Sequence, residues 1–409
     1  MRHRWLSFVV AGLLLGGGIA SAQEILWVET YGQPGDRETA WGAAATADGG
    51  FAMVGYEAPP LEGGGGADDF HLVKVDSQGA FEWSRTWGGF EGDWLTAVVE
   101  HPDGGYVVAG MYGLAPFVHD AYLARTDALG NLVWERRYDG AGLDTRAQDV
   151  WPTSDGGYAV VGQQRVPNGP FESYDVRLIR TDGAGNVAWD RLYRREEYGN
   201  DVGLAVEETA DGGFVIAGST QSSAWACYLL RVDAQGNLLW DQVYGGGFAG
   251  GSCDDLEQTP AGNIVATGCS TPAGDCQTFL VSTDADGVEL WSREFGGASD
   301  DSGHALLRRP DGGFALAGIS SSSTSGWAVD LIRTDADGNP LWQQSWGGDL
   351  DDRGLAIAPA AGGLAVAGFT TPVGQSSQDV LLIKVADAGP LFADGFESGD
   401  PSAWTLVVP

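Results

Sequence analysis

Basic residues are scarce in this sequence. Its 409 residues include 22 lysine and arginine residues against 56 aspartate and glutamate residues, which gives a formal net charge of −34. Two of the 22 are lysines, Lys74 and Lys384. Because so acidic a surface repels phosphate groups, neither nucleic acid nor an anionic membrane surface is expected as a partner.

The sequence also lacks long apolar runs after its first 22 residues. Those residues carry Arg2 and Arg4, an apolar stretch from Leu6 to Ile19, and the small residues Ala20-Ser21-Ala22 before Gln23. This order is typical of a secretory signal peptide, and the apolar stretch is too short and too glycine-rich for a membrane span. We therefore expect an exported protein without a membrane span, either secreted or held in the periplasm or at the cell surface. Cleavage leaves 20 basic residues against 56 acidic ones, a formal charge of −36.

Cysteine is rare as well, with four residues: Cys227, Cys253, Cys269 and Cys276. Their spacing does not follow the paired Cys-x-x-Cys pattern of zinc knuckles. In an exported chain, an even number of cysteines predicts disulfides.

What the sequence has in abundance is a repeat. Its clearest anchors are seven tryptophans spaced 51 to 56 residues apart, Trp27, Trp83, Trp134, Trp189, Trp240, Trp291 and Trp342. Each is followed four residues later by a second aromatic residue, in order Tyr31, Trp87, Tyr138, Tyr193, Tyr244, Phe295 and Trp346. Side chains alternate along a strand, so the two aromatic residues of a pair share one face of a predicted strand.

Two glycine-containing turns recur between these tryptophans. Asp-Gly-Gly occupies residues 48–50, 103–105, 155–157, 211–213 and 311–313, with altered copies at 261–263 and 361–363. Asp-x-x-Gly has six copies, from 76–79 to 335–338, and an altered seventh that starts at Asp387. Glycine supplies the positive φ that tight hairpin turns need, so each unit is predicted to hold four strands.

Seven four-stranded units without helical patterning predict an all-β fold, a seven-bladed β-propeller whose ring closure hides the sheet edges. A solenoid is the alternative, but it would need capping ends, which the sequence does not provide. The first tryptophan strand, residues 25–31, precedes all others, and the last unit ends after Leu381–Val385 without one. The N-terminal strand is therefore predicted to complete the last blade and close the ring.

The pattern Trp…Tyr-Gly-Gly…Asp-Gly-Gly-Phe…Ala-Gly…Leu-Ile-Arg-Thr-Asp…Gly-Asn…Trp resembles the bacterial secreted β-propeller repeat (SBBP-type) family over residues 25–388. This resemblance implies a fold and no particular activity. The segment Thr126–Trp134 is also similar to the tryptophan-docking segment of quinoprotein-like propellers, which implies that the tryptophan strand is outermost and does not imply a quinone cofactor.

The predicted parts of the chain are a signal peptide at 1–22, a propeller at 23–390 and a C-terminal tail at 391–409. The tail stands outside the repeat and resembles a short C-terminal segment on secreted proteins of some Gram-negative bacteria. Two roles fit this tail: it is a sorting or attachment segment, or it packs on the ring.

Tracing the strands places both kinds of tight turn on one face of the ring and the longer, variable loops on the other, here called the loop face. Variable loops on a rigid scaffold are the usual place for binding. The candidate binding residues on this face are Phe117, His119, Asp120, Phe171, Trp225 and Trp327. The alternative is that the aromatic residues among them cap the blade ends.

All four cysteines map to the loop face. Cys269 ends the second strand of its blade and Cys276 precedes the third, so the two can staple one loop. Cys227 begins the third strand of the preceding blade, and Cys253 lies in the next crossover. We therefore predict the pairs Cys269–Cys276 and Cys227–Cys253.

Each crossover between blades carries aspartate: Asp36, Asp93, Asp144, Asp201, Asp254 or Asp255, Asp300 or Asp301, and Asp351 or Asp352. If the first strand of each blade is innermost, these residues surround the mouth of a central channel. We expect their carboxylates to accept N–H groups of their own turns, with binding of a cation such as calcium as the alternative. No other cofactor is expected.

No nucleophile motif or phosphate-binding loop is present in the sequence, and the adjacent His119 and Asp120 are interpreted as polar surface residues. We expect a monomeric, non-catalytic interaction or scaffold module that binds an extracellular protein or glycan through the loop face. The alternative is a carbohydrate-active enzyme, a lyase or hydrolase, acting at the channel mouth. A purely structural envelope component recognised by its tail is the third hypothesis.

Overall fold

The computed structural model describes residues 24–386 except for short stretches: Pro34, 60–66, 169–170, 196–198, 222–223, 246–249, 272–273, 298, 322–325, 348–350 and 372–376. The predicted signal peptide and the predicted C-terminal tail lie outside the described residues. Within the described part, no helix is long and apolar enough to cross a membrane.

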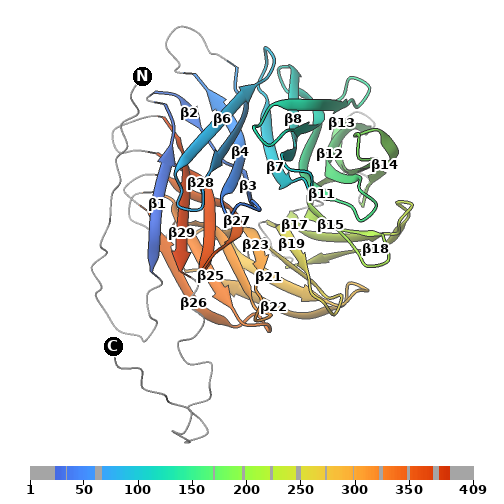
Figure 1. The fold of residues 1–409 in the computed structure, drawn as a ribbon. Helices are drawn as coiled ribbons and strands as arrows, with labels where there is room; N and C mark the ends of the chain where they lie inside the picture. The colour runs from blue at the N-terminus through green and yellow to red at the C-terminus, as the bar shows by residue number, and fades with distance from the viewer. Residues whose placement is uncertain are drawn as a thin grey trace, which may run out of the picture.

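Seven antiparallel sheets form a ring of blades (Figure 1). Blade 1 holds β2 (Arg37–Glu38), β3 (Gly42–Ala45), β4 (Phe51–Ala58), β5 (Asp69–Val75) and β6 (Phe81–Trp87), and blade 2 holds β7 (Trp94–Glu100), β8 (Tyr106–Ala115), β9 (Val118–Thr126) and β10 (Leu132–Tyr138). Blade 3 holds β11 (Thr145–Pro152), β12 (Tyr158–Asn168), β13 (Phe171–Thr181) and β14 (Val187–Tyr193), and blade 4 holds β15 (Asn200–Glu208), β16 (Phe214–Gln221), β17 (Trp225–Val232) and β18 (Leu238–Tyr244). Blade 5 holds β19 (Gly251–Gln258), β20 (Ile264–Ser270), β21 (Gln277–Thr283) and β22 (Glu289–Phe295), and blade 6 holds β23 (Asp301–Arg308), β24 (Phe314–Ser320), β25 (Ala328–Thr334) and β26 (Pro340–Trp346).

Blade 7 confirms the predicted closure of the ring. It combines β27 (Asp352–Ala360), β28 (Gly363–Thr370) and β29 (Asp379–Ala386) with the N-terminal strand β1 (Ile25–Tyr31). Strand β1 lies beside β29 (Figure 1). The two strands pair antiparallel, with Trp27 opposite Lys384 and Tyr31 opposite Val380. Each of the seven blades therefore has four strand positions; in blade 1 the innermost is split into β2 and β3, which both pair with β4.

The blades are held together by apolar clusters that cross each seam. Between blades 3 and 4, for example, Val161 and Leu178 pack with Val206 and Phe214. The inner strands carry many alanines, because little space remains between blades near the axis of the ring.

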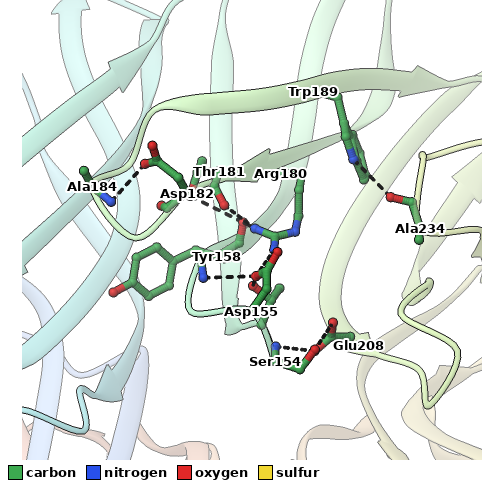
Figure 2. A network of polar contacts seen from close by, with 12 residues as sticks. Ser154, Asp155, Tyr158, Arg180, Thr181, Asp182, Ala184, Trp189, Glu208 and Ala234 are labelled. Carbon is green, nitrogen blue, oxygen red and sulfur yellow. Dashed lines mark hydrogen bonds and ion pairs between the residues drawn. The ribbon is translucent and has the colours of Figure 1, made fainter.

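A second inter-blade contact explains why tryptophan and Asp-x-x-Gly repeat together. The ring of Trp189 lies over the turn of the next blade, where a Cβ added to Gly236 would be 3.0 Å from it. Its Nε1 donates to the carbonyl of Ala234 at 3.2 Å (Figure 2), and Tyr193 Oη donates to the carbonyl of Gly236 at 2.9 Å. The outermost strand of one blade is thus anchored on a turn of its neighbour.

The Asp-Gly-Gly turns are tied to the third strand of their own blade. In blade 3, Arg180 bonds to the Asp155 carboxylate (Figure 2). In blade 1, Lys74 takes the place of that arginine and its Nζ lies 2.9 Å from Asp48 Oδ2. Partial burial opposes ionisation of Asp48, but hydrogen bonds from Lys74 and Thr46 lower its pKa to about 2. In blade 5, Ala261 takes the place of the aspartate and Ser282 takes the place of the arginine, so both partners of the ion pair are missing from this blade.

Candidate functional site

The innermost strands share an irregularity that defines a site. In blades 2 to 7 the pairing of the first and second strands shifts by one residue, at Thr96, Gln148, Leu204, Asp254, His304 and Leu355. Such a β-bulge inserts one extra residue and re-aims side chains. In blade 1, Trp41 occupies the corresponding place just before β3. These seven residues are here called the bulge residues.

Glycine on the neighbouring strand makes room for the bulge. At Gly218 of β16, an added Cβ would lie 1.9 Å from the carbonyl oxygen of Val202 in β15. Gly162 of β12 stands in the same relation to Arg146, at 1.9 Å. The glycine of this repeat position is therefore required by the close approach of the two strands.

All seven bulge residues line a single cavity of about 430 Å³. Because every blade contributes, the cavity lies on the axis of the ring. The innermost strands begin at the loop face, and the bulge residues fall within the first five residues of each, which places the cavity toward that face. Six residue types occupy these seven positions, with leucine twice, whereas the position after each holds glycine or alanine in five of the seven blades.

The wall that blades 5 to 7 contribute to this cavity carries several polar groups. His304 Nδ1 lies 2.8 Å from Asp254 Oδ2, and both side chains are partly exposed. Arg353 lies over the rings of Trp327 and Phe369, at 5.7 and 5.5 Å from their centroids, and its Nε has no hydrogen-bond partner among the residues that the structure describes. Trp41, on the wall contributed by blade 1, is 45% exposed. An exposed indole, an imidazole–carboxylate pair and a guanidinium therefore line one space.

Two further carboxylates in the cavity bond across seams. Asp149 Oδ2 accepts the N–H of Val206 at 3.0 Å, and Asp255 Oδ2 accepts the N–H of Leu306 at 2.7 Å. Burial raises the pKa of Asp149 to about 6 and that of Asp255 well above its ordinary value. These two side chains therefore connect neighbouring innermost strands. In the other blades the same position holds alanine or glycine, which cannot form such a bond.

The structure separates the predicted binding residues. Phe117, at the tip of the β8–β9 hairpin, is 81% exposed and has φ of 65°. Trp225 begins β17 and is half-buried, whereas Trp327 is half-buried beside Arg353 at the channel mouth. Phe171 begins β13, but its side chain lies outside the described part of the structure.

His119 and Asp120 differ most from the expectation, because both are buried. His119 Nδ1 lies 2.7 Å from Asp144 Oδ1, and its ring lies beside Trp94 with centroids 6.0 Å apart. These contacts reach blade 3 from β9 and make His119 part of a blade seam. The interpretation of the His119–Asp120 pair as polar surface is therefore wrong.

The crossover aspartates accept backbone N–H groups, as expected. Asp93 accepts from Gly89 at 2.5 Å, and Asp301 accepts from Gly297 at 2.9 Å. In blade 1 this role falls to Glu38, which accepts from Gln33 at 2.9 Å, and not to Asp36. Asp254 is also different, because it faces the channel.

The four cysteines form Cys227–Cys253 and Cys269–Cys276, the expected pairs. Cys253 lies within β19 and not in the crossover before it, because that strand already begins at Gly251. The Cys227–Cys253 bridge therefore links blade 4 to blade 5 through two buried residues.

Sequence reasoning missed the bulge residues except Asp254, which it named as one of two alternatives at the channel mouth. The signal for the others was a varied residue in an innermost strand directly before a position that is mostly small. It could not be interpreted without the register, because the bulge breaks the alternation that predicts which residues face the axis.

Neither a protein-family model nor a curated protein matches the chain. Solved structures do share its fold. A protein of unknown function from Dyadobacter fermentans DSM 18053 aligns with a TM-score of 0.51 and 11% identity over 89% of this chain and 98% of that one. The WD40 domain of Neurospora crassa Pan2 gives 0.51 and 12% over 88% and 98%, and the polysaccharide lyase Uly1 gives 0.53 and 10% over 83% and 88%. At such low identity the likeness shows the fold alone, a seven-bladed β-propeller, and function must be argued from the site.

Proposed function

We propose that the protein is an exported, non-catalytic binding propeller that takes part of a glycan into the loop-face mouth of its central channel. The observation that carries this proposal is the set of seven bulge residues, which include six residue types and all line one cavity. Varied side chains that converge on one cavity are what a binding site on a repeated scaffold needs.

The chemistry of the cavity suits a polar ligand with flat apolar faces. Trp41 offers an exposed aromatic surface, while Gln148, Asp254, His304 and Arg353 offer donors and acceptors. A cavity of about 430 Å³ falls in the size range of small-ligand sites. Export is supported by the N-terminal sequence, and the SBBP-type repeat supports kinship with other exported propellers; a protein loop is the other ligand class to be tested.

A glycan array probed with the mature protein tests this proposal. We expect binding by the native protein and a loss of about five- to thirtyfold in Trp41→Ala, since one stacked aromatic residue contributes about 1–2 kcal/mol. Phe90→Ala is the matched control, because Phe90 is fully exposed and does not line the cavity. Equal binding by the native protein and Trp41→Ala would show that the glycan does not bind in this cavity. If the protein instead captured a protein that carries no glycan, the ligand would be a protein and not a glycan.

Catalysis at the channel mouth is the second candidate, and the His304–Asp254 pair favours it. A carboxylate that holds Nδ1 orients the imidazole, so that Nε2 can act as a general base or acid. Incubation with neutral and uronate-containing polysaccharides, followed by assays for unsaturated products and new reducing ends, tests this candidate. Turnover that disappears in His304→Gln would establish an enzyme in place of the binding module.

A further inference from the structure

Arg353 is a charged side chain of the channel cavity that has no partner within the described part of the chain. Five residues with ionisable side chains line the cavity: Asp149, Asp254, Asp255, His304 and Arg353. Asp254 and His304 pair with each other. In each of the other two aspartates, both carboxylate oxygens accept backbone N–H groups. The guanidinium of Arg353, by contrast, forms no hydrogen bond or ion pair with any described residue.

Arg146 shows the same position with its charge neutralised. Arg146 of β11 and Arg353 of β27 both lie two residues before the bulge residue of their strand. Arg146 Nε lies 2.9 Å from Asp144 Oδ2. Asp351 is the counterpart of Asp144 in blade 7, since each accepts an N–H from the start of the third strand of the preceding blade. Within the described residues, however, Asp351 forms no ion pair with Arg353, which leaves the guanidinium free for a ligand.

Aromatic rings hold Arg353 in place of an ion pair. Its Cζ lies 5.7 Å from the ring centroid of Trp327 in blade 6 and 5.5 Å from that of Phe369 in blade 7. An aromatic face attracts a cation without neutralising its charge, and it leaves the N–H donors of the guanidinium unused. The side chain is therefore ordered before a ligand arrives, so that less side-chain entropy is lost on binding.

The neighbours of Arg353 around the channel suit a sugar. Blade 6 contributes His304 on one side, and blade 1 contributes the exposed Trp41 on the other. Across the seam between blades 7 and 1, Ala40 N donates to the Gly368 carbonyl at 3.3 Å. Ala40 precedes Trp41 in the chain, and Gly368 precedes the residue that pairs with Arg353. The indole and the guanidinium thus belong to adjoining walls, within reach of one sugar unit.

The acidic surface that repels a polyanion acts only weakly on a single group inside the cavity. Charges are screened over about 8 Å at physiological ionic strength, so the groups that line the cavity decide. Burial raises the pKa of Asp149 and of Asp255, which favours their neutral forms, and Asp254 has His304 as its partner. The charge in the cavity that is left without a partner is therefore the positive charge of Arg353.

We propose that the glycan taken into the channel is acidic, and that Arg353 binds its carboxylate or sulfate group. The assignment rests on the proposed glycan site and specifies the class of sugar that this site takes. The planar guanidinium matches the paired oxygens of such a group with two parallel hydrogen bonds. Trp41 packs against an apolar face of the sugar from the adjoining wall.

Calorimetry with matched oligosaccharides tests the proposal on the native mature protein. Oligomers of galacturonate, glucuronate and mannuronate are each compared with their carboxyl-reduced counterparts, in which a hydroxymethyl group replaces the carboxylate. Sulfated galactan oligomers and their desulfated forms test the second anionic group. We expect the acidic member of at least one pair to bind about 10- to 150-fold more tightly than its neutral counterpart, as for a hydrogen bond to a charged group.

Substitution of Arg353 should remove this preference. Arg353→Gln should lower the affinity for the acidic oligosaccharide by a similar factor and leave the affinity for its neutral counterpart unchanged. Arg353→Lys keeps the charge but lacks the planar fork, so its affinity should lie between those of the other two proteins. Arg146→Gln is the matched control, because Arg146 holds the same repeat position in blade 3, pairs with Asp144 and does not line the cavity. It should bind as the native protein does.

The outcomes separate this proposal from the glycan site itself. Equal affinities of the native protein for both members of every pair, or undiminished binding of the acidic member by Arg353→Gln, would overturn the role of Arg353 and leave the glycan site in place. Binding of no glycan, acidic or neutral, would refute the proposed function. The comparison within pairs needs the native protein alone, so it decides the question even if Arg353→Gln does not fold.

Discussion

Trp134 lies over Gly185 of the next blade, and a Cβ added to Gly185 would be 2.9 Å from its ring. Tyr138, four residues after Trp134, donates its hydroxyl to the Gly185 carbonyl at 2.9 Å. The tryptophan, the second aromatic residue and the Asp-x-x-Gly turn of the repeat are thus parts of one contact between neighbouring blades.

Gly185→Ala should destabilise the protein more than Gly156→Ala does. Both glycines have positive φ, 75° and 86°, so both variants bear the penalty of about 1–2 kcal/mol for alanine in that region. An added Cβ meets the Trp134 ring at Gly185 and nothing within 4 Å at Gly156. Overpacking should add about 1–3 kcal/mol at Gly185. Urea unfolding measures the difference in stability. Equal losses of stability in the two variants would show that the Trp134 side chain moves aside without cost.

Removing the Cys227–Cys253 bridge should cost more stability than removing Cys269–Cys276. The bridges span 26 and 7 residues of sequence, for which the chain-entropy relation gives about 3.5 and 2.4 kcal/mol. The first bridge also links two blades in a buried cluster. Double alanine variants compared by thermal unfolding under identical oxidising conditions check the order, and a reversed order would refute it.

Glu207→Gln should change how stability depends on pH. Glu207 Oε2 accepts the N–H of Gln258 at 3.0 Å, and burial, reinforced by Glu257, raises its pKa to about 7. A raised pKa means that the fold favours the protonated form. The stabilisation is therefore fully present below about pH 4 and is lost as the pH rises through 7.

In Glu207→Gln the new side-chain amide is neutral at every pH, and its oxygen can still accept the N–H of Gln258. Glu207→Gln should thus gain stability relative to the native protein between pH 5 and pH 8, by up to about 3 kcal/mol. Urea unfolding at the two pH values measures this gain. Parallel pH profiles of the two proteins would contradict it.

The two lysines should resist acylation in the folded protein. The side chain of Lys74 is 3% exposed and bonds to Asp48, Glu82 and the Val75 carbonyl. Lys384 is 8% exposed and lies 6.0 Å from the Trp27 ring centroid. Mass spectrometry after brief treatment with an acylating ester should find both unmodified in buffer and modified in urea. Rapid native labelling of Lys74 would contradict its burial.

The sequence by itself determined the blade number, the closing strand, the turns and the cysteine pairs. These features depend on local backbone preferences used seven times, so each copy repeats the evidence for the others. Gly185 and Gly236, for example, are readable as turn residues without any knowledge of Trp134 or Trp189.

Tertiary structure alone decided the sites. A bulge shifts the alternation of side chains, so Asp254 and His304 meet in the channel although their strand pattern does not show it. His119 is buried because β9 extends far enough to reach Asp144 of the next blade. Glu38 of blade 1 and Asp379 of blade 7 meet only when the ring closes and brings both ends of the chain together, a long-range contact to which no local preference points.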